Sequence, residues 1–99
     1  MAAHISNNLS QAYAGNGSVS VSATPSGGTL IRPANAGRLH VFLTNSGTKT
    51  VTISLGNSAV ALSGIVLSAG QSVNFQTYSG AIYAITSGGD TTTVSYTEI

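Results

Sequence analysis

From residue 19 onward, apolar and polar side chains alternate in short runs that are separated by clusters of turn-forming residues. Residues 19–24 alternate strictly, and residues 38–45 and 49–55 repeat the pattern. A period of two places every second side chain on one face, as in a half-buried β-strand, whereas an α-helix has a period of about 3.6. The alternation therefore predicts that this part of the chain folds into strands.

About eight such runs follow one another, with turn signals roughly every eight to twelve residues, the spacing of a β-sandwich or barrel. A chain of 99 residues fits one domain. We therefore expect an all-β, single-domain sandwich or barrel of about eight short antiparallel strands, with jelly-roll-like connections, over residues 19–99. Spacing does not reveal strand order, so it leaves open the choice between sandwich and barrel.

The strongest local prediction is a hairpin formed by residues 38–45 and 49–55. Each run has three apolar residues on one face: Leu39, Val41 and Leu43, then Val51, Ile53 and Leu55. The residues between the runs, 45–48, have the Asn-Ser-Gly composition of a tight turn.

Phe42 lies on the other face of the first run, among the polar side chains of Arg38, His40 and Thr44. Burying an aromatic ring contributes strongly to a core or an interface. We expect the second layer of the fold to bury Phe42, and coverage by a neighbouring subunit is the alternative.

Two later runs carry further predictions. Residues 80–86 are apolar on both faces, which is typical of a central or interface strand. Residues 91–98 place Val94 and Tyr96 on one face and end in Glu98, which we expect to pair with a basic group. Asp90 follows two glycines and is expected in a turn.

Charged residues make up 5% of the chain, against roughly 25% in a typical soluble domain. No basic patch exists to neutralise phosphates, so we expect no nucleic-acid partner. No apolar run approaches the roughly 20 residues of a membrane-spanning helix, so we expect no membrane partner. With no Cys, two acidic residues and two His, the chain is also expected to hold no metal and no cofactor.

The same scarcity argues against catalysis. His4 and His40 are the only imidazole bases, and Asp90 and Glu98 lie too far apart in sequence and setting to suggest an acid–base pair. No Gly-x-Ser-x-Gly nucleophile motif and no Gly-rich phosphate loop occurs. We expect a protein that is not an enzyme and has no catalytic residues.

Residues 1–18 are mostly polar and are predicted to form an extended N-terminal arm. Ile5, Leu9 and Tyr13 recur at a spacing of four, which would place them on one side of a helical turn. We expect these three residues to bind a partner when the arm orders against a neighbour. A frayed terminus is the alternative.

Five segments in order resemble small virion proteins of tailed bacteriophages. They read R-L-x-V-x-L-x-N-x-G from Arg38, V-T-I-S-L-G from Val51, G-I-x-L-x-x-G from Gly64, G-A-I-Y-A-I from Gly80 and V-S-Y-x-E-I from Val94. The set covers residues 37–99 and is similar to patterns in capsid decoration, head-fibre and related minor structural proteins. Residues 1–36 bring no comparable match.

The resemblance implies a non-enzymatic decoration, or cement, protein on the outer surface of the virion capsid. Such a protein would bind the major capsid protein and stabilise the shell, as a homo-oligomer with a trimer favoured. The alternative is a receptor- or glycan-binding domain of a tail fibre or baseplate. The absence of Trp and of acidic sugar ligands counts against that alternative.

Overall fold

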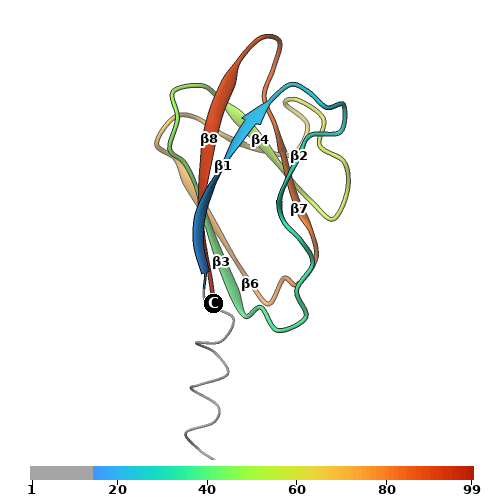
Figure 1. Ribbon diagram of the computed structural model, residues 1–99, viewed down its shortest axis with the longest axis vertical. Helices are drawn as coiled ribbons and strands as arrows, with labels where there is room; N and C mark the ends of the chain where they lie inside the picture. The colour runs from blue at the N-terminus through green and yellow to red at the C-terminus, as the bar shows by residue number, and fades with distance from the viewer. Residues whose placement is uncertain (1–14) are drawn as a thin grey trace, which may run out of the picture.

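All elements of the described chain are β-strands (Figure 1). The structure is a computed structural model, and it describes residues 15–99. The strands are β1 Gly15–Ser22, β2 Thr29–Arg32, β3 His40–Asn45, β4 Val51–Leu55, β5 Ile65–Leu67, β6 Ser72–Gln76, β7 Ile82–Ile85 and β8 Thr91–Glu98.

The strands form two four-stranded antiparallel sheets that pack as a sandwich. Sheet A has the order β1-β8-β3-β6, and sheet B has the order β2-β7-β4-β5. This interleaved order is that of an eight-stranded, double-sheet jelly roll. The prediction of an all-β jelly-roll-like domain is confirmed, and the open choice is decided in favour of the sandwich.

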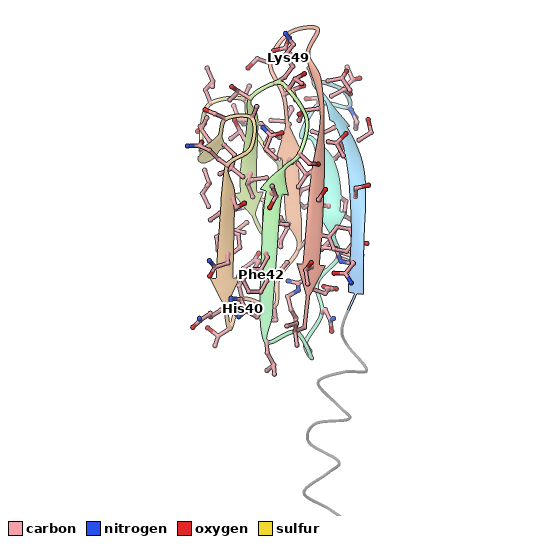
Figure 2. All side chains as sticks on the ribbon, turned by 90° about the vertical axis from the view of Figure 1, so that its left-hand side faces the viewer. His40, Phe42 and Lys49 are labelled. Atoms are coloured by element: carbon pink, nitrogen blue, oxygen red, sulfur yellow. The ribbon has the colours of Figure 1, made fainter. Side chains whose placement is uncertain are left out.

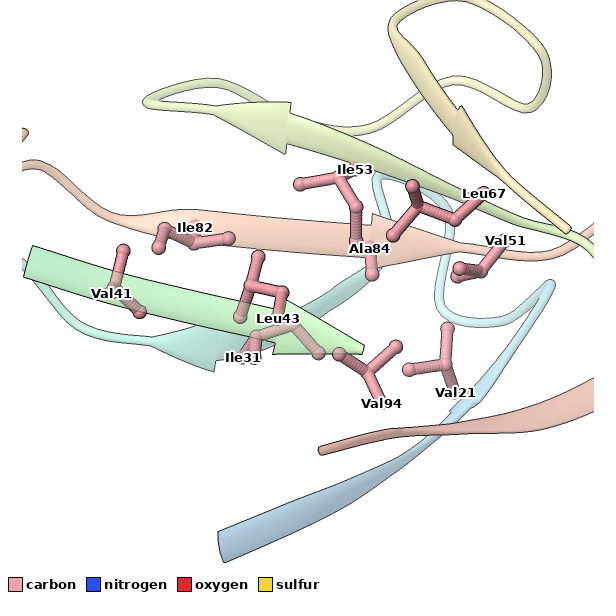
Figure 3. Close-up of a cluster of buried hydrophobic side chains, with 10 residues drawn as sticks. All are labelled: Val21, Ile31, Val41, Leu43, Val51, Ile53, Leu67, Ile82, Ala84 and Val94. Carbon is pink, nitrogen blue, oxygen red and sulfur yellow. The ribbon is translucent and has the colours of Figure 1, made fainter. Parts of the chain in front are cut away.

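The core lies between the two sheets and is built from small aliphatic side chains (Figure 3). Alternation along each strand turns these residues inward and leaves polar ones outside. The predicted inward residues of β3 and β4, apart from Leu39 and Leu55, are fully buried. The buried cluster consists of Val21, Ile31, Val41, Leu43, Val51, Ile53, Leu67, Ile82, Ala84 and Val94.

The predicted hairpin of residues 38–55 is wrong, although both of its strands exist. β3 belongs to sheet A, where it pairs with β6 and β8, and β4 belongs to sheet B, where it pairs with β5 and β7. The turn residues 45–48 therefore carry the chain across the sandwich from one sheet to the other. Two alternating strands have the same sequence pattern whether they pair in one sheet or pack against each other from two sheets.

Asn45 explains why the chain crosses at this point. Its buried amide nitrogen donates to the carbonyl oxygens of Lys49 (2.7 Å) and Leu67 (3.0 Å), both on the sheet B side. Its Oδ1 accepts from the Thr92 hydroxyl (2.8 Å) in sheet A and from the Gly47 backbone N–H (3.3 Å). One buried side chain thus satisfies polar groups of both sheets, which a solvent-exposed hairpin turn would not require.

The strand of residues 80–86 is central, as predicted. β7 lies between β2 and β4 in sheet B, and Ile82, Ala84 and Ile85 are buried. β5 is short, with three residues.

The boundary of the predicted arm differs from the structure, since residues 15–18 belong to β1 and pair with β8. The Gly15-Asn16-Gly17 segment resembles a break in the strand pattern, yet it is strand. A Cβ atom on Gly17 would lie 2.5 Å from the Tyr96 hydroxyl oxygen, so glycine makes room for the Tyr96 ring against β1. Close packing explains this glycine better than a turn does.

Candidate interaction surfaces

Of the side chains considered for catalysis, His4 lies outside the described residues, and His40, Asp90 and Glu98 are not brought together. His40 lies at the start of β3 on the outer face of sheet A, and Asp90 sits in the turn before β8, where its N–H donates to the Ser87 carbonyl. Glu98 is at the other end of β8, eight residues from Asp90 and about 27 Å away along an extended strand. No group of three or more His, Cys, Asp or Glu side chains gathers among residues 15–99.

The described region also lacks concave sites. Residues 15–99 enclose no pocket, and none of their structure is a helix of the length and hydrophobicity needed to cross a membrane. Any partner of this region therefore meets its outer faces, edges or loops.

Glu98 forms a buried ion cluster with Arg32 and Arg38. Arg32 donates from Nη2 to Glu98 Oε1 (2.7 Å), and Arg38 donates from Nε to Glu98 Oε2 (3.1 Å). Arg38 and Glu98 are each 2% exposed. The pairing predicted for Glu98 is present, and Arg32 and Arg38 are both its partners.

The placement of Arg38 corrects the prediction that it lies beside His40 on the outer face. β3 begins at His40, so Arg38 precedes the strand and turns into the end of the sandwich. Its Nη1 and Nη2 atoms donate to the carbonyl oxygens of Tyr78, Gly80 and Pro33 at 3.2, 2.9 and 2.7 Å. Arg38 therefore links the loop between β2 and β3, the loop between β6 and β7, and the last strand, β8.

The electrostatics of the cluster follow from these contacts. Burial by itself would raise the pKa of Glu98, but hydrogen bonds from Arg32 and Arg38, and their charges, hold that pKa below its usual value. The hydrogen bond with Glu98 raises the pKa of Arg32. Arg32 also lies over the Tyr96 ring, 4.6 Å from its centroid, which adds a cation–π contact. Each charged group has an ion-pair partner, although the two guanidinium groups and one carboxylate leave the cluster one net positive charge. The cluster is structural.

The outer face of sheet A carries no formally charged side chain. Residues that pair across neighbouring strands point to the same side of the sheet, and the pairs that point outward are almost all hydroxyl or amide side chains. Figure 2 views this face, with His40 and Phe42 near one end and Lys49 at the opposite end of the molecule. The outward residues are Asn16, Ser18, Ser20, Ser22, Thr91, Thr93, Ser95, Thr97, His40, Phe42, Thr44, Ser72, Asn74 and Gln76.

Phe42 is exposed on this face, so the expectation that the second layer buries it is wrong. Its ring is stacked on His40 with centroids 4.2 Å apart, and His40 Nε2 hydrogen-bonds to Asn74 Oδ1 at 3.3 Å. The second layer packs against the opposite side of sheet A, where Val41 and Leu43 point. Alternation predicted the face of Phe42, but the layer covering that face was assigned wrongly.

Three exposed apolar residues lie near the end of sheet A where β1 begins, and we call Leu39, Phe42 and Ile99 the end patch. They are 58%, 40% and 39% exposed. The N–H groups of Leu39 and His40 both donate to the Ile99 carbonyl, which joins the patch across β3 and β8. Leu39 was expected in the core, but it precedes β3 and lies beyond the core's end.

The outer side of sheet B is more apolar than that of sheet A. Leu30 and Val66 point outward from β2 and β5, and Val60 and Leu62 project from the loop between β4 and β5. Leu62 is 67% exposed and has a φ of 64°, a backbone conformation that bulky side chains seldom adopt. Its N–H is held by the Thr52 hydroxyl at 2.9 Å.

The predicted partner-binding residues Ile5, Leu9 and Tyr13 lie outside the described residues. Sequence reasoning singled out Phe42 among the exposed apolar groups of the folded domain, but it predicted that the second layer buries this ring. Leu39 and Ile99 could have been flagged only by knowing where β3 and β8 end.

Comparison with known proteins shows the fold and no family. No protein-family model and no curated protein matches the chain. A solved structure from a study of Bacillus endospore appendages, described as forming disulfide-linked pili, is similar with a TM-score of 0.52 and 18% sequence identity. The match covers 86% of this chain and 83% of that chain.

Proposed function

We propose that this chain is a non-enzymatic structural subunit that binds the outer surface of a bacteriophage capsid and stabilises the shell. The observation that carries the proposal is the charge-free outer face of sheet A, which ends in exposed apolar side chains. Such a face suits a broad contact with another protein better than it suits a small ligand. The capsid itself enters from the sequence resemblance, and the pilus structure supports only the fold.

Binding of this kind stabilises a shell by mass action. If the site that the subunit binds exists only on the assembled capsid, binding shifts the equilibrium toward assembly. Many copies of a modest contact add up, because neighbouring contacts on one particle act together. A net charge of +1 adds little repulsion between copies, which suits a homo-oligomer such as a trimer.

The N-terminal residues Ile5, Leu9 and Tyr13 are proposed as further contacts with a neighbouring subunit. Their apolar side chains recur every four residues in an otherwise polar segment. An apolar stripe of this kind gains most by burial against another apolar surface.

A co-sedimentation experiment tests the proposal. Purified protein is mixed with capsids that lack it, and the bound fraction is measured from low to high salt. Because the proposed face carries no charge, affinity should change less than about twofold between roughly 0.05 and 0.5 M salt. Decorated capsids should also resist heating better than bare ones.

A matched pair of variants locates the binding face. Ser20 is exposed on the outer face of sheet A, and Ser63 is exposed in the loop over sheet B. Ser20→Glu should weaken capsid binding about tenfold by placing an unpaired charge in the contact, whereas Ser63→Glu should not. Equal effects of the two variants, or binding to host cells and not to capsids, would contradict the proposal.

A further inference from the structure

The end patch lies where the N-terminal segment joins the folded domain. Gly15 pairs with Glu98, so the chain enters sheet A beside Ile99, the residue after that partner. Figure 1 shows the start of β1 and the C-terminus at the same end of the molecule. Leu39, Phe42 and Ile99 stay partly exposed there, although His40 stacks on the ring of Phe42.

The segment before Gly15 has a composition that matches this patch. Its 14 residues carry no Lys, Arg, Asp or Glu, and they include Ile5, Leu9 and Tyr13 at intervals of four. Side chains four apart lie on one side of a helix, where they form a continuous apolar stripe. The side chains of the end patch are likewise uncharged, and the charged groups of Arg32, Arg38 and Glu98 are paired with one another.

The direction of the chain favours the patch of another copy over its own. β1 runs from this end into the domain. A return to the same patch needs a reversal within residues 9–14, which contain no Gly, Pro, Asn or Asp, the residues that form tight turns. A helix of 14 residues is about 21 Å long, so the apolar stripe can reach a neighbouring domain that packs close to this end.

We propose that residues 5–13 of one copy cover the end patch of a second copy. This inference rests on the proposed role of the N-terminal segment as a subunit contact, and it names the surface that receives it. Each copy then gives one segment and receives another. Such head-to-tail contacts close into a ring when the rotation between copies permits, and a trimer is one such ring.

Disulfide trapping tests the contact directly, because the chain has no Cys of its own. Ser10→Cys places a thiol in the segment without altering the apolar residues. Gln76→Cys places one on β6 beside the patch, opposite His40 in register. Ser63→Cys, an exposed site over sheet B, is the matched control.

Two purified variants with one introduced thiol each are mixed without capsids, one of them labelled with ¹⁵N, and oxidised mildly. We expect the disulfide between positions 10 and 76 of labelled and unlabelled chains to form about tenfold more than the one between positions 10 and 63, because docking raises the local concentration. Adding Leu9→Ser and Tyr13→Ser to the Ser10→Cys chain should abolish the preference. Trypsin separates position 10 from positions 63 and 76 by cutting after Arg38 and Lys49.

Equal yields at positions 76 and 63, or no disulfide at either, would overturn the proposal. A Ser10→Cys/Gln76→Cys chain that oxidises wholly within itself would show instead that the segment folds onto its own patch. These results are independent of capsid binding. Failure of trapping while capsids still bind the protein rejects this contact alone.

Discussion

Arg38 Nε donates to Glu98 Oε2 at 3.1 Å, and both side chains are sealed from solvent at the end of the sandwich. The bond links the loop before β3 to the last residue of β8. Arg32 completes the cluster from β2 in the opposite sheet, so three parts of the chain depend on one carboxylate.

Glu98→Gln should lower the free energy of unfolding by about 3–5 kcal/mol, because it leaves Arg38 as an uncompensated buried charge. Urea unfolding followed by circular dichroism measures the change. Asp90→Asn is the control, since Asp90 lies in a turn and makes its turn contacts through the backbone. A loss of similar size in the control would argue against the ion cluster as the cause.

The stability of the protein should fall in acid because of the same residue. The pKa of Glu98 is lowered in the folded state, so its contribution is present above the unfolded value of about 4.3 and is lost as pH falls through the folded value. Unfolding measured from about pH 7 to pH 2 should show the decline beginning near pH 4–5. The gap between wild type and Glu98→Gln should shrink over this range. A constant gap would refute the assignment.

Asn45→Ala should destabilise the sandwich by about 1–3 kcal/mol or more, because it leaves several buried backbone and hydroxyl groups without partners. The Thr92→Val variant removes one of these partners and is the natural second arm of a double-mutant cycle. The combined loss should be smaller than the sum of the separate losses. Strict additivity would show that the two side chains do not cooperate.

Gly17→Ala and Gly15→Ala should differ, although both glycines lie in β1 two residues apart. A Cβ at position 17 would press on the Tyr96 ring, whereas a Cβ at position 15 meets nothing within 4 Å. We expect a loss of about 1–3 kcal/mol for Gly17→Ala and less than about 0.5 kcal/mol for Gly15→Ala. Thermal unfolding of the two variants side by side provides the measurement.

The sequence was a sound guide to local structure. Alternation identified the strands and the inward positions of Val41, Leu43, Val51 and Ile53, because burial on one face imposes the period directly. It also assigned β7 to the middle of a sheet. These features depend on neighbours along the chain.

The sequence did not predict which strands pair, or which side chains are buried by segments distant along the chain. Asn45 looks like a turn residue in either a hairpin or a crossover, and only its contacts with Leu67 and Thr92 distinguish the two. Arg38 was placed on the surface because a strand was extended two residues too far. The end patch was missed for the same reason, since it consists of side chains at or near strand ends.

The position of β8 between β1 and β3 has a consequence for how the protein is made. β8 is the last strand along the chain, yet both of its neighbours in sheet A come from the first half. During synthesis, β1 therefore cannot pair in sheet A until residues 91–98 have left the ribosome. Sheet A forms completely only after that segment is translated. A ribosome-bound chain stalled at Asp90 should remain sensitive to protease, whereas a chain extended by a linker beyond Ile99 should resist it.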